Sequence, residues 1–65
     1  MTFTLYKTPT GWRWRLVARN GNVMADSGEG YRRRQDALAA IASLKRSVVR
    51  AVVIQESGGR SVLIQ

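Results

Sequence analysis

The chain of 65 residues contains no cysteine and no histidine, and only one proline. Without cysteine and histidine it has no disulfide framework, no thiolate or imidazole metal site and no histidine acid–base group, and we expect no metal and no other cofactor. A domain this short buries only about 60% of the surface that its unfolded chain exposes. Small domains therefore usually need a disulfide, a metal or a partner subunit to be stable. Because the composition excludes the disulfide and argues against the metal, we expect a partner subunit.

Acidic residues are also few, with four against eleven basic residues and a net charge of +7. The four are scattered over the predicted elements, so we expect no carboxylate pair for acid–base work or for Mg²⁺. The serines have no histidine to activate them. The sequence therefore predicts a protein that is not an enzyme and has no catalytic residues. Its excess positive charge favours nucleic acid or another polyanion as a partner.

Long apolar runs are missing as well. No stretch approaches the ~20 apolar residues that a membrane span requires. Residues 1–7 lack the basic and apolar regions of a secretory signal, so we expect a cytoplasmic protein without a membrane span. The hydrophobic content of 45%, in an alternating pattern, argues against disorder.

The first half of the chain predicts an antiparallel three-stranded meander. Apolar and polar residues alternate over 2–7, 12–19 and 23–27, which is the period of half-buried strands. We predict a four-residue hairpin loop at 8–11 and a two-residue type I′ turn at Asn20-Gly21. These turns set the register and place Leu5 opposite Trp14, and Arg15 opposite Asp26. One face of the sheet is then apolar, formed by Phe3, Leu5, Trp14, Leu16, Ala18, Val23 and Ala25.

The second half predicts one helix and further strands. A helix over 35–46 carries apolar residues at helical spacing that would cover the apolar face of the sheet: Ala37, Leu38, Ile41, Leu44 and Val48. Residues 49–55 are largely apolar and β-branched, interrupted by Arg50, which predicts a fourth strand. A turn at 57–60 precedes a short fifth strand at 62–64. No linker or repeat divides the chain, so we predict a single α+β domain over residues 1–65.

Several motifs resemble the YegP-like family. They are Phe3–Lys7, Gly11–Leu16, Asn20-Gly21 and Ser27–Tyr31, together with helix positions Ala37, Ile41, Ser43 and Lys45. The resemblance covers residues 3–46 and leaves 57–65 as a C-terminal extension. It implies a small domain of unknown function with one β3-α-β unit, completed by the exchange of C-terminal strands in a homodimer. No catalytic or binding residues are established for the family, so the resemblance implies none here.

Two groups of residues are candidates for binding nucleic acid or another anion. The first shares the polar face of the predicted sheet: Tyr6, Arg13, Arg15 and Arg19. Basic and aromatic side chains on a sheet face can bind single strands, although any open sheet also needs polar residues on its wet face. The second group precedes the helix, whose N-terminal N–H groups attract anions: Gly28, Gly30, Arg32, Arg33 and Arg34. For these arginines the alternative is simple solvation.

The sequence therefore predicts a homodimeric, non-enzymatic module that binds nucleic acid weakly through its arginines. The alternative is a protein-interaction module that pairs a partner strand through an exposed sheet edge or through its C-terminal tail. The oligomeric state separates the two hypotheses, because a stable dimer uses that edge internally and a monomer leaves it free.

Overall fold

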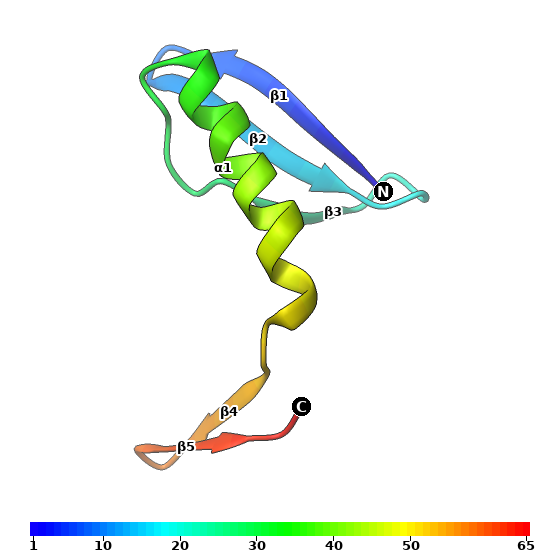
Figure 1. Cartoon of the computed structure of the whole chain (residues 1–65), viewed down its shortest axis with the longest axis vertical. Helices are drawn as coiled ribbons and strands as arrows, with labels where there is room; N and C mark the ends of the chain where they lie inside the picture. Colours follow the sequence, from blue (N-terminus) through cyan, green and yellow to red (C-terminus); the bar gives the residue numbers. More distant parts are fainter.

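The computed structural model describes all residues 1–65. Its elements are the strands β1 (Thr2–Thr8), β2 (Gly11–Val17) and β3 (Val23–Asp26), the helix α1 (Arg34–Ser47), the 3₁₀ helix η1 (Val48–Arg50), and the strands β4 (Ile54–Ser57) and β5 (Arg60–Leu63). An antiparallel sheet of order β1-β2-β3 carries α1 on one face, and β4 and β5 form a separate sheet beyond the helix (Figure 1). The predicted α+β class, three-stranded meander and single helix are confirmed.

The first hairpin has the predicted register. Lys7 lies opposite Trp12 and Phe3 opposite Leu16, so all five predicted pairs are present. Its loop is shorter than the four residues we predicted, because Thr8 and Gly11 also pair and leave only Pro9 and Thr10 in the turn. Pro9 has the negative φ that a type I or type II turn needs at its first central position, and the glycine that follows the turn, Gly11, has a φ of 128°.

The predicted type I′ turn at Asn20-Gly21 is wrong. That turn needs positive φ at both central residues, and Gly21 has a φ of 90° whereas Asn20 has no positive φ. Instead, the Gly21 N–H donates to the Ala18 carbonyl over 2.9 Å, and the Ala18 N–H donates to the Asn22 carbonyl over 2.8 Å. The loop therefore has three residues, and Arg19 lies in it rather than in the strand.

The longer loop shifts the pairing of β3 by one residue. Val17 pairs with Val23 and not with Met24 as predicted, and an irregularity beside Met24 then restores the predicted pair of Leu16 and Ala25. A β-bulge of this kind absorbs one extra residue in one strand. Val23 consequently shares the face of Val17 and is exposed, so it does not belong to the apolar face where we expected it.

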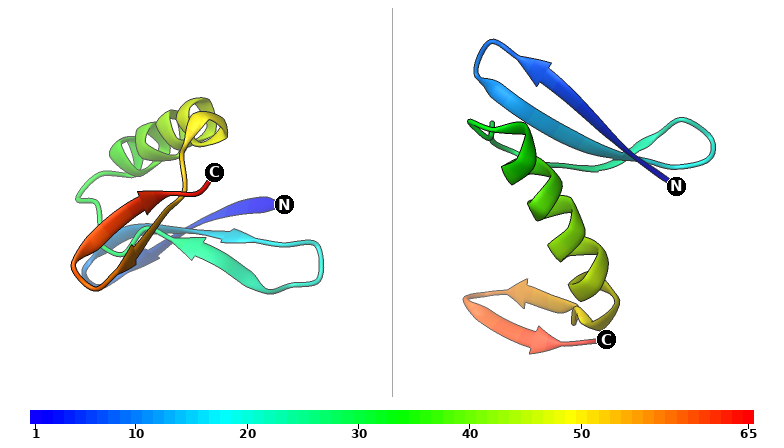
Figure 2. Two further views of the ribbon diagram at one scale, coloured as in Figure 1. Left: turned by 90° about the horizontal axis from the view of Figure 1, so that it is seen from below. Right: turned by 45° about the horizontal axis from the view of Figure 1, so that its top comes forward.

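Figure 2 shows α1 lying over one face of the sheet, and the core lies between the two. Its buried residues are Trp14 (8% exposed), Ala37 (0%) and Ile41 (9%). The Phe3 ring meets Trp14 edge to face, with 5.5 Å between the ring centroids. The prediction that Leu38 and Val48 also cover the sheet is wrong for both, because they are exposed. The central turns of the helix therefore make most of the contact with the sheet.

The C-terminal strands differ most from prediction. Residues 48–50 continue the helix as η1, and the fourth strand begins at Ile54 rather than at Val49. No strand of the chain lies beside residues 49–52, and β-branched side chains alone do not make a strand. The predicted turn at 57–60 is confirmed, since Gly58 and Gly59 both have positive φ and connect β4 to β5.

The segment before α1 is held against the first hairpin by a close backbone contact. The Trp12 N–H donates to the Tyr31 carbonyl and the Tyr31 N–H donates to the Trp12 carbonyl, each over 2.7 Å. A Cβ atom on Gly30 would lie 2.5 Å from the Thr10 carbonyl oxygen, and one on Gly11 would lie 2.7 Å from the Tyr31 carbonyl oxygen. Glycine at both positions therefore allows the contact that places the start of α1 over the sheet.

Replacement of Gly30 by alanine is expected to destabilise the domain by about 2–4 kcal/mol, because the backbone of Thr10 has to move away. Urea denaturation followed by far-UV circular dichroism measures the change in the free energy of unfolding. The matched control is Gly28→Ala, where φ is +73° but no atom lies within 4 Å of the added Cβ, so the cost is about 1–2 kcal/mol. Equal costs for the two variants would show that the close contact is not what requires Gly30.

Candidate functional site

The face of the sheet opposite α1 carries a cluster of polar side chains from β1 and β2. Tyr6 is the cross-strand partner of Arg13, and Thr4 is the partner of Arg15. The guanidinium carbon of Arg15 lies 4.3 Å from the centroid of the Tyr6 ring, a cation–π contact. Arg13 donates from Nη2 to Thr10 Oγ1 over 3.3 Å. The structure thus brings together three predicted site residues, which we call the sheet-face cluster: Tyr6, Arg13 and Arg15.

Asp26 is the acidic residue opposite this cluster in the sheet, but its carboxylate is hydrogen-bonded to the backbone of the following turn. Asp26 is the cross-strand partner of Arg15, as predicted. Its carboxylate accepts a hydrogen bond from the Gly28 N–H over 2.9 Å, in the turn that follows β3. The cationic group of Arg15 meanwhile lies over Tyr6. The cluster therefore presents two guanidinium groups, while the Asp26 carboxylate is held in the turn.

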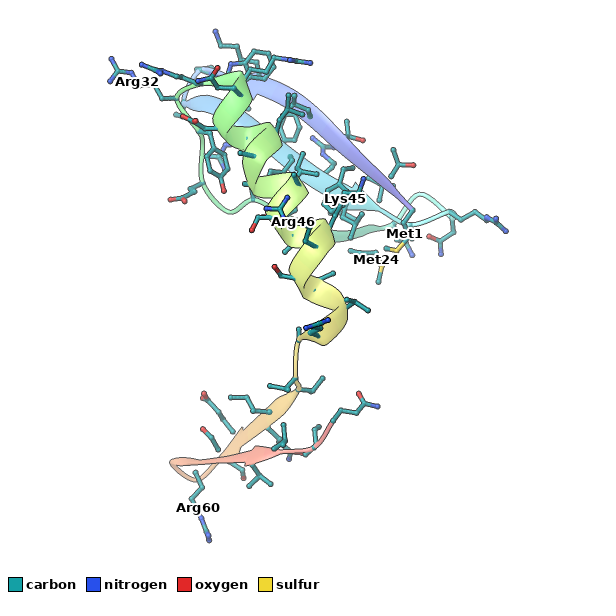
Figure 3. The ribbon with its side chains drawn as sticks, viewed as in Figure 1. Met1, Met24, Arg32, Lys45, Arg46 and Arg60 are labelled. Carbon is teal, nitrogen blue, oxygen red and sulfur yellow. The ribbon has the colours of Figure 1, made fainter.

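The second predicted group lies at the start of α1. Arg32, Arg33 and Arg34 are all exposed, and Arg33 is the N-cap residue without a capping side-chain hydrogen bond. In Figure 3 Arg32 points away from the body of the molecule. The two glycines of the predicted anion site have structural contacts instead: Gly28 donates to Asp26, and Gly30 packs against Thr10. What the structure offers to an anion here is therefore the three exposed arginines.

The two groups lie at the same end of the molecule. Trp12 and Tyr31 are joined by their backbone hydrogen bonds, and Arg13 and Arg32 follow them directly in the sequence. Arg19 is not part of this arrangement, because it lies in the loop beyond the opposite end of β2. Arg13 and the last residue of β2, Val17, are already about 13 Å apart along the strand, and Arg19 lies beyond them.

Sequence reasoning missed an apolar groove beside the core. The groove has a volume of about 810 Å³, and eight of its ten lining residues are hydrophobic. It lies between the sheet and the C-terminal half of α1, and its lining includes Met1, Phe3, Trp14, Leu16, Leu44 and Val48. The exposed Val48 lies at its rim. The apolar residues at helical spacing indicated an apolar helix face. The sequence did not show which part of that face extends beyond the sheet, because this depends on where the helix lies.

The C-terminal hairpin is a second apolar surface that the structure leaves uncovered. β4 and β5 contact each other and no other element, and they project beyond the end of α1 (Figure 2). Ile54 pairs with Leu63, and the neighbouring Val62 points to the opposite face of the hairpin. Six apolar residues near the base of the hairpin are each between 43% and 65% exposed: Val52, Val53, Ile54, Val62, Leu63 and Ile64. Both faces of the hairpin are therefore apolar at its base.

Two classes of site are not assembled in this structure. No group of three or more aspartate, glutamate, histidine or cysteine residues comes together that could hold a metal ion. None of its helices has both the length and the apolar character needed to cross a bilayer.

Comparison with known proteins gives one match. A family model described as a domain of unknown function, DUF1508, matches residues 10–55, which is well over half of the chain. YegP-like proteins are members of that family, so the resemblance seen in the sequence is confirmed. Neither the search of curated proteins nor the search of solved structures found a match.

Proposed function

The chain belongs to the DUF1508 family of domains of unknown function, and from this starting point we propose that it is a non-enzymatic binding module that works as a homodimer. The observation that carries the proposal is the C-terminal hairpin, which is apolar on both faces and touches no other element of its own chain. An uncovered apolar surface of this kind is typical of a protein–protein interface.

The extended shape and large accessible surface of the chain support the proposal that a partner subunit covers part of it. Its radius of gyration is 14.5 Å, whereas a compact chain of this length has about 11 Å. Its accessible surface is 5499 Å², against about 4,200 Å² for a compact monomer of this mass. The excess of roughly 1,300 Å² per chain is more than the ~800 Å² that each partner buries in a standard interface.

The apolar groove is the surface that fits the hairpin of a second copy. The groove lies between α1 and the sheet, and the chain leaves its rim at Val48 before it forms the hairpin. In a two-fold dimer each hairpin would fill the groove of the partner, so the same contact would form twice. The family resemblance implies an exchange of C-terminal strands into one continuous sheet, and we propose a hairpin seated at the partner's groove as the form that this exchange takes, because it covers both apolar surfaces at once.

Light scattering on the purified protein tests the homodimer. The expected mass is twice the 7.3 kDa of one chain, and it is expected to stay so over about a hundredfold range of concentration. A mass of one chain would contradict the dimer. It would favour the alternative function, in which the free hairpin or a free sheet edge pairs with a strand of a different protein.

We propose nucleic acid as the ligand of this module. The support is the net charge of +7 and the grouping of Arg13, Arg15 and the three arginines of 32–34 at one end of the molecule. Arginine is well suited to phosphate, since its planar guanidinium donates two parallel hydrogen bonds. The exposed arginines at the start of α1 can donate to phosphates, and contacts of that kind position a nucleic acid without reading its sequence.

A triple variant with alanine at Arg32, Arg33 and Arg34 is expected to weaken nucleic-acid binding and its salt dependence. The logarithm of the affinity should fall linearly with the logarithm of salt, with a slope of about 0.7–0.9 per phosphate neutralised, and the variant should lose up to three such increments. Fluorescence anisotropy with labelled oligonucleotides at several salt concentrations measures both. The control is Arg46→Ala on the helix, which lies away from this end (Figure 3). An unchanged affinity in the triple variant would exclude the start of α1 from the interface.

A further inference from the structure

We propose that the sheet-face cluster is a stacking site for single-stranded nucleic acid, with an unpaired base lying on the guanidinium plane of Arg15. The inference rests on the proposed binding of nucleic acid and adds the surface and the form of the ligand. It distinguishes this surface from the start of α1, where exposed charge alone would attract any polyanion.

The contact between Arg15 and Tyr6 prepares one flat surface for a base. A guanidinium group is planar, and its carbon lies 4.3 Å from the centroid of the Tyr6 ring. In the proposed site the guanidinium plane lies along the ring, so that the side away from Tyr6 receives a planar ligand. Bases of single strands stack on aromatic rings and on arginine planes in this manner. The ring fixes the orientation of the guanidinium before the ligand arrives, which lowers the entropy lost on binding.

Arg13 supplies a donor for the backbone of the same strand. It lies two residues before Arg15 on β2, so both side chains are on one face about 7 Å apart. The hydrogen bond from Arg13 Nη2 to Thr10 Oγ1 holds the guanidinium toward the first hairpin. Its other N–H groups remain to donate to phosphate, which arginine binds through several donors. The cluster thus combines one stacking plane with one phosphate contact.

The shape of this surface favours single strands over duplexes. The helix packs on the opposite face with Trp14 and Ile41, so no element of the chain covers the cluster. A duplex keeps its bases stacked on one another and shows only its backbone to a sheet face, since groove reading needs an inserted helix or ribbon. A single strand can turn a base onto the plane of Arg15.

Anisotropy titrations with a labelled oligothymidylate and with a duplex of equal length test the inference. The wild-type protein is expected to bind the single strand about tenfold more tightly, which is the contribution of one stacked base. Arg15→Lys keeps the charge and removes the plane, and Tyr6→Leu removes the supporting ring. Each is expected to lower the affinity for the single strand about five- to tenfold and to leave the duplex affinity within about twofold. Arg46→Lys is the matched control on the helix.

The outcomes separate this inference from the proposed function. Equal affinities for the two forms, or single-strand binding by Arg15→Lys that equals wild type, would overturn the stacking site and leave general nucleic-acid binding intact. No binding of either form at moderate salt would overturn both. Tryptophan fluorescence of a Trp12→Phe variant gives an independent readout, because its remaining tryptophan, Trp14, is buried on the helix side of the sheet. It is expected to stay constant on titration, and strong quenching would place the ligand on the other face. If the Tyr6→Leu variant does not fold, the single-strand and duplex affinities of Arg15→Lys alone decide whether the stacking site exists.

Discussion

The Trp14→Ala variant is expected to be unfolded. Trp14 is the large residue of a core with only three buried side chains, and it contacts the edge of Phe3. Loss of a buried tryptophan costs about 3–5 kcal/mol, from the lost transfer free energy and from the cavity left behind. Native domains have only about 0.05–0.15 kcal/mol of stability per residue, so the loss equals much or all of the total. Far-UV circular dichroism and urea denaturation measure the outcome.

Two control variants show whether burial is the reason. Trp14→Phe keeps a large ring and removes the indole N–H, which is buried without a hydrogen-bond partner, so this variant is expected to fold. Trp12→Ala removes a half-buried ring that is in contact with the Lys7 ammonium group, and should cost about 1–2 kcal/mol. A stable Trp14→Ala protein would mean that the apolar and polar faces of the sheet are reversed.

Glutamate at both Ile54 and Leu63 is expected to convert the homodimer to a monomer. The two residues are cross-strand partners at the base of the C-terminal hairpin, and the proposed dimer buries them in the groove of the partner. A buried carboxylate without a partner is costly, so the dissociation constant should rise at least about a hundredfold, or about 2.7 kcal/mol. Sedimentation velocity measures the mass. The three-stranded sheet and α1 are expected to keep their secondary structure, because β4 and β5 contact only each other.

The matched control places the same two charges at the polar tip of the hairpin. Glutamate at Ser57 and Ser61 adds the same charge to β4 and β5 near the Gly58-Gly59 turn. This control is expected to remain a dimer. If the Ile54 and Leu63 variant also remains a dimer, the hairpin is not the interface and the homodimer is held by another surface.

The first hairpin and the helix could be predicted because local signals agree with each other there. The alternation of β1 and β2 and the Pro9 turn allow one register, and a shift by one residue would bury Arg13 and Arg15. That register also places Arg15 diagonally across from Tyr6, within reach of the observed contact. These residues of the candidate site were therefore accessible to sequence reasoning.

The second hairpin shows where local signals are ambiguous. Asn20-Gly21 fits a two-residue type I′ turn, and it equally fits a three-residue loop in which only the glycine has positive φ. Val23 and Met24 are both apolar, so the pattern does not reveal which of them is the extra residue of the bulge. The position of Arg19 depends on this choice, which is why it lies in the loop and not in β2, where we predicted it.

The C-terminal segment could not be predicted because its partners are not local. Apart from Arg50, residues 49–54 are all apolar, so the alternation that would distinguish a strand from the end of a helix is absent. The structure continues the helix to Arg50 and starts the strand at Ile54. The groove could not be predicted from the sequence either, because its presence depends on how far α1 extends past the sheet. In the proposed homodimer the C-terminal hairpin of one copy covers the groove of the other.

Isotope-filtered nuclear Overhauser spectroscopy tests that central claim most directly. Labelled and unlabelled chains are unfolded, mixed and refolded together, and only contacts between the two kinds of chain are recorded. The account predicts contacts from the methyl groups of Ile54 and Leu63 in one copy to the rings of Phe3 and Trp14 in the other. A spectrum in which the hairpin shows contacts only within its own chain would contradict it.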